Sequence, residues 1–122
     1  MKGRIALVVT ALTGAALVAA PAGDGAATKR VKVEDNFFSP TKVTVNQGTT
    51  VRWTQPESAT DVHDVKLTSA PKGVKKFQSD PMSQGSTYSK KLTRSGTYKI
   101  LCTFHEEDDM RMTVVVRKRK KK

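Results

Sequence analysis

The sequence predicts a single all-β domain, a β-sandwich built from short strands. Its 122 residues leave room for one domain, and hydrophobic residues make up 37% of the chain, which is enough for one modest core. Apolar and polar residues alternate in short segments that are separated by Gly, Pro, Asn and Ser. This pattern is typical of half-buried strands joined by turns. Because no long helical periodicity and no internal repeat accompany it, a sandwich is favoured.

The first three strands are indicated by alternation and by one turn. A short segment at 30–33 opens the domain. The segment 41–45 then alternates with two valines on one face, and 49–53 does the same with a valine and the single tryptophan. The Asn-Gln-Gly sequence at 46–48 separates these two segments and predicts a turn.

The second half of the domain is expected to supply four more strands. Val65 and Leu67 alternate with polar neighbours, and a long irregular connection with two prolines and two glycines follows at 69–85. A Ser-Gly turn at 95–96 separates two further alternating segments. The expected strands of this half are 62–67, 86–92, 97–102 and 112–116.

The N-terminal residues are not expected to belong to the domain. A basic start is followed by an uncharged run at 5–20, rich in Ala, Val and Leu, and then by small residues at 20–22. This is the layout of a secretory signal peptide. An uncleaved membrane anchor is the alternative, but the run is shorter than the about 20 apolar residues that a span needs. We therefore expect an exported protein, periplasmic, cell-surface or secreted. Its expected parts are a signal peptide at 1–22 (cleavage as late as 27 is the alternative), a linker at 23–28, the domain at 29–116 and a basic tail at 117–122.

The net charge of +11 is mainly a property of the tail. Six basic residues fill 117–122, and the signal peptide holds two more, so the folded body carries a net charge of only about +3. A basic tail does not make a nucleic-acid-binding face, and we expect no nucleic-acid partner. The tail is expected to attach to an anionic membrane or wall surface, the alternative being a merely solubilising end.

The residues that carry chemistry are concentrated near the C-terminus. Cys102, the only cysteine, is followed by His105 and Met110, and His63 is the only other histidine. Each of them alone would more often be an ordinary core or hydrogen-bonded residue. A thiolate, two imidazoles and a weak axial thioether are together the ligand set of a blue-copper electron-transfer site. Their joint occurrence predicts that these four residues bind one type 1 copper ion.

The expected strands place these ligands at one end of the sandwich. Cys102 ends one strand, Met110 precedes the next, and the residues between them form a loop. His63, near the start of the expected strand 62–67, is expected to reach the same point. Met112 lies two residues beyond Met110 and faces the same side of its strand; core packing is favoured over ligation for Met112.

Family resemblance supports this interpretation. The segment from Cys102 to Met110 resembles the copper loop of plastocyanins, which have the same Cys-x-x-His-x-x-x-x-Met spacing. Its continuation into the valines at 114–116 resembles amicyanins and pseudoazurins. The opening strands are similar to those of cupredoxins in Phe38, Ser39, Pro40, Val43, Val45, Gly48, Val51 and Trp53. The resemblance covers residues 31–116 and implies a Greek-key β-sandwich, cupredoxin-like, with copper at one end.

The resemblance also implies a function and roles for the ligands. It implies a one-electron carrier, Cu(I)/Cu(II), that exchanges electrons with redox partner proteins as a monomer. His105 is then the ligand nearest to solvent, and both imidazoles ligate through Nδ1. An enzyme is not expected, because four protein ligands leave no open position for a substrate. A copper store or chaperone, and a copper-free interaction domain, remain alternatives.

Three features depart from the family pattern. Asp64 stands where the family often has Asn, and it is still expected to accept a hydrogen bond from Thr103. Met112 stands where Gly is common. Four carboxylates at 106–109 replace small and apolar residues. This acidic run is expected to steer a cationic partner, the alternative being a solvated loop without a partner.

Overall fold

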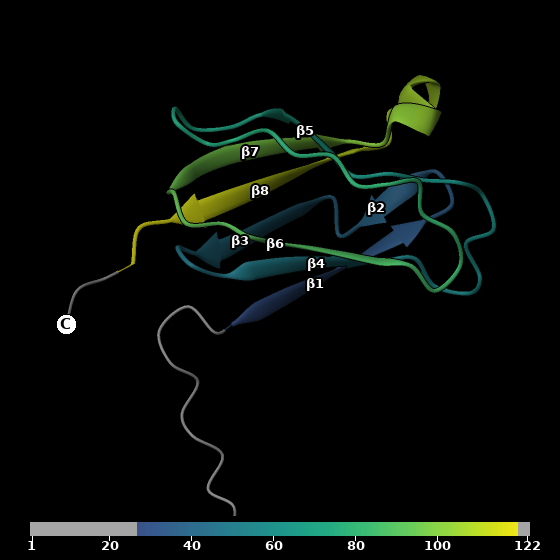
Figure 1. Ribbon diagram of the computed structural model, residues 1–122, viewed down its shortest axis with the longest axis horizontal. Helices are drawn as coiled ribbons and strands as arrows, with labels where there is room; N and C mark the ends of the chain where they lie inside the picture. Colours follow the sequence, from purple (N-terminus) through teal and green to yellow (C-terminus); the bar gives the residue numbers. More distant parts are fainter. Residues whose placement is uncertain (1–26, 120–122) are drawn as a thin grey trace, which may run out of the picture.

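The computed structural model describes residues 27–119, which form two packed β-sheets (Figure 1). The strands are β1 (Thr28–Glu34), β2 (Phe37–Ser39), β3 (Lys42–Asn46), β4 (Thr50–Thr54), β5 (Lys66–Ser69), β6 (Thr87–Lys91), β7 (Gly96–Leu101) and β8 (Arg111–Arg117). A 3₁₀ helix, η1 (Thr103–Asp108), lies between β7 and β8. The predicted all-β sandwich is confirmed. The signal peptide expected at 1–22, most of the linker and the tail residues 120–122 lie outside the described residues.

The two sheets contain four strands each. One has the order β2-β1-β4-β6 and the other β3-β8-β7-β5. The pairs β1–β4 and β3–β8 are parallel, and the remaining pairs are antiparallel. Because β3, β4, β5 and β6 alternate between the sheets along the chain, the connections cross from one layer to the other and gather at the two ends of the sandwich.

The core between the sheets follows the alternation of the sequence. In β3 and β4 every second residue is buried, and Trp53 of β4 is fully enclosed. Tyr98, Ile100 and Cys102 line up on the buried face of β7 and its extension. Burial of each aliphatic side chain contributes about 1.5–3 kcal/mol, so this layer supplies the rigid base on which the connections are held.

Two expectations about the elements need correction. The short strand β2 was not predicted, and β5 begins only at Lys66 rather than at residue 62. The preceding backbone is bonded elsewhere: His63 exchanges two hydrogen bonds with Met82, at 3.2 and 2.7 Å, and the Val65 N–H donates to Ser79 Oγ at 2.9 Å. His63 therefore lies on the β4–β5 connection, in an isolated bridge, and not at the start of a strand.

The two ends of the sandwich differ. We call the end where β7 stops and η1 begins the loop end, and Figure 1 shows it opposite the end at which β8 stops. Arg117, the last residue of β8, is therefore remote from η1. No helix within residues 27–119 is long and apolar enough to cross a membrane.

Candidate metal centre

Three metal-binding side chains meet at the loop end. His63, Cys102 and His105 each offer one ligand atom, and these atoms lie within 4.8 Å of one another. They come from different places: Cys102 directly follows β7, His105 belongs to η1, and His63 lies on the β4–β5 connection. His63 and Cys102 are completely buried, whereas the His105 side chain is 17% exposed.

The spacing of the two buried donors fits a shared metal ion. His63 Nδ1 lies 3.8 Å from Cys102 Sγ. With metal–nitrogen and metal–sulfur bonds of about 2.0–2.3 Å, two such donors in one trigonal plane lie roughly 3.5–4 Å apart. Burial raises the pKa of the Cys102 thiol, so the free thiol keeps its proton at neutral pH and must release it when a metal binds.

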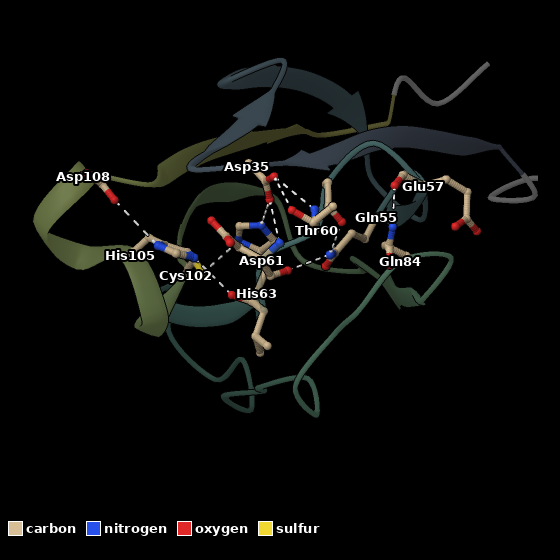
Figure 2. Close-up of polar contacts among 12 residues, drawn as sticks. Asp35, Gln55, Glu57, Thr60, Asp61, His63, Gln84, Cys102, His105 and Asp108 are labelled. Atoms are coloured by element: carbon tan, nitrogen blue, oxygen red, sulfur yellow. Dashed lines mark hydrogen bonds and ion pairs between the residues drawn. The ribbon is translucent and has the colours of Figure 1, made fainter.

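The other ring nitrogen of His63 contacts a residue that was not among the predicted site residues. His63 Nε2 lies 2.9 Å from Oδ1 of Asp35, in the β1–β2 turn (Figure 2). The Asp35 carboxylate also accepts the backbone N–H groups of Thr60 and Asp61, each at 3.0 Å. These bonds, first the one with His63 and then those from the backbone, lower the pKa of Asp35 from 3.8 to about 2.

Asp64 ties the two ligand-bearing segments together. Its carboxylate accepts the Thr103 N–H at 2.7 Å and the Thr103 hydroxyl at 2.6 Å. It also accepts the side-chain amide of Gln78 at 2.9 Å. The expected bond between Asp64 and Thr103 is therefore present. Since Asp64 and Thr103 directly follow His63 and Cys102 in the chain, this contact fixes the spacing of the two buried donors.

The chain between Cys102 and Met110 is a compact turn rather than an open loop. It contains η1, and Asp109 ends this helix with a left-handed backbone (φ 54°). The Met110 N–H donates to the His105 carbonyl at 3.3 Å, and the Cys102 N–H donates to the Met110 carbonyl at 3.0 Å. The backbone of Met110 is thus bonded to both other members of the sequence motif.

The two methionines of this region have different surroundings. Both are buried: Met110 is completely enclosed, and Met112 is 3% exposed. Met112 Sδ accepts a hydrogen bond from the Trp53 indole N–H at 3.2 Å, inside the core. This contact occupies the Met112 thioether and supports the expectation that Met112 packs in the core.

His105 lies at the surface beside apolar and acidic neighbours. Its Nε2 is 3.1 Å from the Val62 carbonyl oxygen, and its Nδ1 is 3.6 Å from Asp108 Oδ2. The side chains of Val62 and Phe104 are exposed, to 46% and 51%. The carboxylates at 106–109 are exposed as well. The surface around His105 is therefore a small apolar patch with an acidic border.

Comparisons with known proteins agree with this geometry. Residues 26–117 match the family model of copper-binding proteins of the plastocyanin/azurin family. The chain is 37% identical over 87 residues to amicyanin-alpha of Methylorubrum extorquens, a match that covers 70% of this chain and 67% of the relative.

Solved amicyanin structures have the same fold. A reduced amicyanin variant superposes with a TM-score of 0.64 at 29% identity, over 74% of this chain and 82% of the other. An oxidized variant gives 0.62 at 29% identity, over 77% and 84%. The donor set described above, with a thiol, two imidazoles and thioethers, fits the copper that the family is known to bind.

Proposed function

The chain belongs to the plastocyanin/azurin family of copper-binding proteins, and on that premise we propose that it carries single electrons with one type 1 copper ion. We propose His63, Cys102, His105 and Met110 as the ligands. The observation that carries this proposal is the convergence of three soft or borderline donors within 4.8 Å at one end of a rigid sandwich. Copper, when bound, supplies a one-electron couple between Cu(I) and Cu(II).

The protein holds the donor atoms in a fixed geometry. Cys102 is anchored to β7, which is paired with both β5 and β8. His63 is held by its backbone bridge to Met82 and by its side-chain bond to Asp35. A frame of this kind changes little between the two oxidation states, so each transfer requires little reorganisation. With its four ligands in place the site has no position for a substrate, which supports a carrier rather than an enzyme.

His105 is proposed as the ligand through which electrons pass. Of the three clustered donors it is the only one with an exposed side-chain fraction, 17%. The exposed Val62 and Phe104 beside it offer an apolar contact surface, and the acidic run at 106–109 would attract a cationic redox partner.

Electrochemistry of the copper-loaded protein tests the carrier function. We expect a reversible one-electron wave and rapid reduction and reoxidation, with copper retained over many cycles. Rapid transfer of copper to a metal-free acceptor, together with sluggish redox cycling, would favour a copper store or chaperone. Cys102→Ser, which removes the thiolate, is the control and should lose the wave.

We also propose that the protein is exported and that its C-terminal tail binds an anionic surface. The layout of residues 1–22 supports export. The strand that precedes the tail, β8, ends at Arg117, at the end of the sandwich opposite to η1 (Figure 1). Binding through the tail would therefore leave the surface around His105 free for a partner.

Binding to vesicles that contain phosphatidylglycerol tests the tail. Arg117 of β8 pairs with Asn46 of β3, and its carbonyl accepts the Gln47 N–H at 2.8 Å, so deletion should begin at residue 118. Removing 118–122 should weaken binding by about 1 kcal/mol for each basic residue lost. A variant with the same residues replaced by Gln separates charge from length. Unchanged binding in both variants would reduce the tail to a solubilising end.

A further inference from the structure

His63 is held between two partners on opposite sides of its ring. Nδ1 faces Cys102 Sγ at 3.8 Å, and Nε2 faces Asp35 Oδ1 at 2.9 Å (Figure 2). The ring is completely buried, so water does not compete for either nitrogen. An ionised carboxylate only accepts hydrogen bonds. The proton of a neutral His63 therefore belongs on Nε2, which leaves the Nδ1 lone pair directed at the metal-binding cluster.

Asp35 is itself held in place by a second layer of hydrogen bonds. The N–H groups of Thr60 and Asp61 donate to its two carboxylate oxygens, each at 3.0 Å. The backbone that presents them is fixed in turn by Gln55, whose side-chain amide donates to the carbonyls of Ala59 and Asp61, each at 2.8 Å. The carboxylate is therefore aimed at His63 by a built arrangement and not by a chance contact of a flexible side chain.

The second histidine has no such partner on its Nε2. A carboxylate does lie near its ring, but Asp108 Oδ2 is 3.6 Å from Nδ1, the nitrogen expected to bind the metal. The Nε2 of His105 lies 3.1 Å from the neutral carbonyl oxygen of Val62. A hydrogen bond to an ionised acceptor is about twice as strong as one between neutral groups. Of the two imidazoles, His63 is thus the one with an ionised acceptor on the ring nitrogen that faces away from the metal-binding cluster.

We propose that Asp35 is a positioning residue that fixes the tautomer and orientation of His63 and, through the charged hydrogen bond, makes it a stronger ligand for Cu(II) than for Cu(I). The part that concerns copper rests on the proposed function. The more positive ion gains more from an electron-rich imidazole, so Asp35 lowers the reduction potential. Removing the carboxylate should weaken Cu(II) binding more than Cu(I) binding and raise the potential.

Asp35→Asn is the test, and Asp61→Asn is its matched control. Asp61 lies in the same connection and contributes its backbone N–H to Asp35, while its side chain is exposed. Both variants remove one negative charge near the site, but only Asp35→Asn removes the ionised acceptor that faces His63. Asp35→Glu restores a carboxylate and should recover part of the effect.

The first measurement uses metal-free protein and nitrogen-15 NMR of the histidine rings. Wild-type protein and Asp61→Asn should carry the His63 proton on Nε2. Asp35→Asn should weaken this preference, because an amide can present either its oxygen or its N–H group to the ring. A wild-type His63 protonated on Nδ1 would overturn the proposal even if no variant folds. Because no copper is involved, this measurement tests Asp35 independently of the proposed function.

The second measurement compares copper affinity and midpoint potential. Loss of a carboxylate behind a ligating histidine typically weakens metal binding about 10- to 100-fold. If Cu(II) affinity falls tenfold more than Cu(I) affinity in Asp35→Asn, the potential rises by about 59 mV. An equal rise in Asp61→Asn would show that only net charge matters, and no rise in Asp35→Asn would show that Asp35 is merely structural. Either result overturns the proposal.

Discussion

Two histidines face each other at the loop end, and their surroundings are unlike. Their ring centroids are 4.7 Å apart. His63 is completely buried and bonded to Asp35, which is anchored by backbone N–H groups. His105 is 17% exposed, lies on a short 3₁₀ helix and contacts a backbone carbonyl. The same side chain is thus fixed and shielded in one place and accessible in the other.

This difference indicates a division of tasks within one site. A buried, anchored imidazole keeps the donor geometry constant, because neither water nor a rotamer change can displace it. An imidazole at the surface brings the site within reach of a partner, because docking at His105 requires no opening of the core. Substitutions on the two sides of the site should therefore have different effects.

The largest effect should appear when each ring is removed from the metal-free protein. His63→Ala leaves a cavity at a fully buried position and deprives Asp35 of its main partner. We expect a loss of about 2–5 kcal/mol in the free energy of unfolding, typical of large-to-small changes in a core. His105→Ala should lose only about 1 kcal/mol, the value of one hydrogen bond. Urea unfolding of the two variants measures both, and equal losses would remove the basis of the comparison.

Substitution of Met110 and Met112 tests which of the two methionines is a copper ligand. Met110, bonded through its backbone to His105, is proposed as the axial ligand, so Met110→Leu should shift the midpoint potential and the visible spectrum. Met112→Leu should leave both nearly unchanged. It should instead cost about 1–3 kcal/mol of stability, because the buried Trp53 indole N–H loses its acceptor. A larger spectral change in Met112→Leu than in Met110→Leu would reverse the assignment.

The smallest effect concerns access to His105. Replacing the carboxylates at 106–109 by their amides should slow electron transfer to a cationic small-molecule oxidant about tenfold at low salt and speed it with an anionic one. These changes should shrink at physiological ionic strength, where screening acts over about 8 Å. The rates are corrected for any change in driving force.

A control with carboxylates outside the acidic run tests whether position matters. It replaces Glu34, Glu57 and Asp80 by their amides, and the rate changes are compared per charge removed. If this control changes the two rates as much per charge as the first variant, the effect comes from net charge and the acidic run does not steer partners.

The sequence predicted those parts of the site whose residues lie close together along the chain. The Cys102–Met110 segment is short and is bounded by two clear strands, so its spacing alone indicated a metal site. His63 could be selected only because the chain has a single other histidine. The bond between Asp64 and Thr103 joins residues that are 39 positions apart. A local sequence pattern does not reveal such a contact, so the bond was expected only from the family resemblance.

Other features were hidden for physical reasons. Asp35 is 28 residues from His63, and nothing in its local sequence distinguishes it from an ordinary turn residue. The strand expected at 62–67 extended the alternation of Val65 and Leu67 too far toward the N-terminus, because β5 begins only at Lys66. Before Lys66 the backbone pairs with Met82 and with the Ser79 side chain, which supply tertiary hydrogen bonds that no periodicity encodes. The 3₁₀ helix η1 likewise follows from closure of the turn between Cys102 and Met110.

The absorption spectrum after addition of Cu(II) tests whether the buried Cys102 thiolate and the two unlike histidines bind one copper ion. We expect an intense visible thiolate-to-copper band that saturates at one equivalent of copper. Cys102→Ser should lose this band while remaining folded. If wild-type protein with bound Cu(II) shows only the weak absorption of ordinary cupric complexes, the claim is wrong.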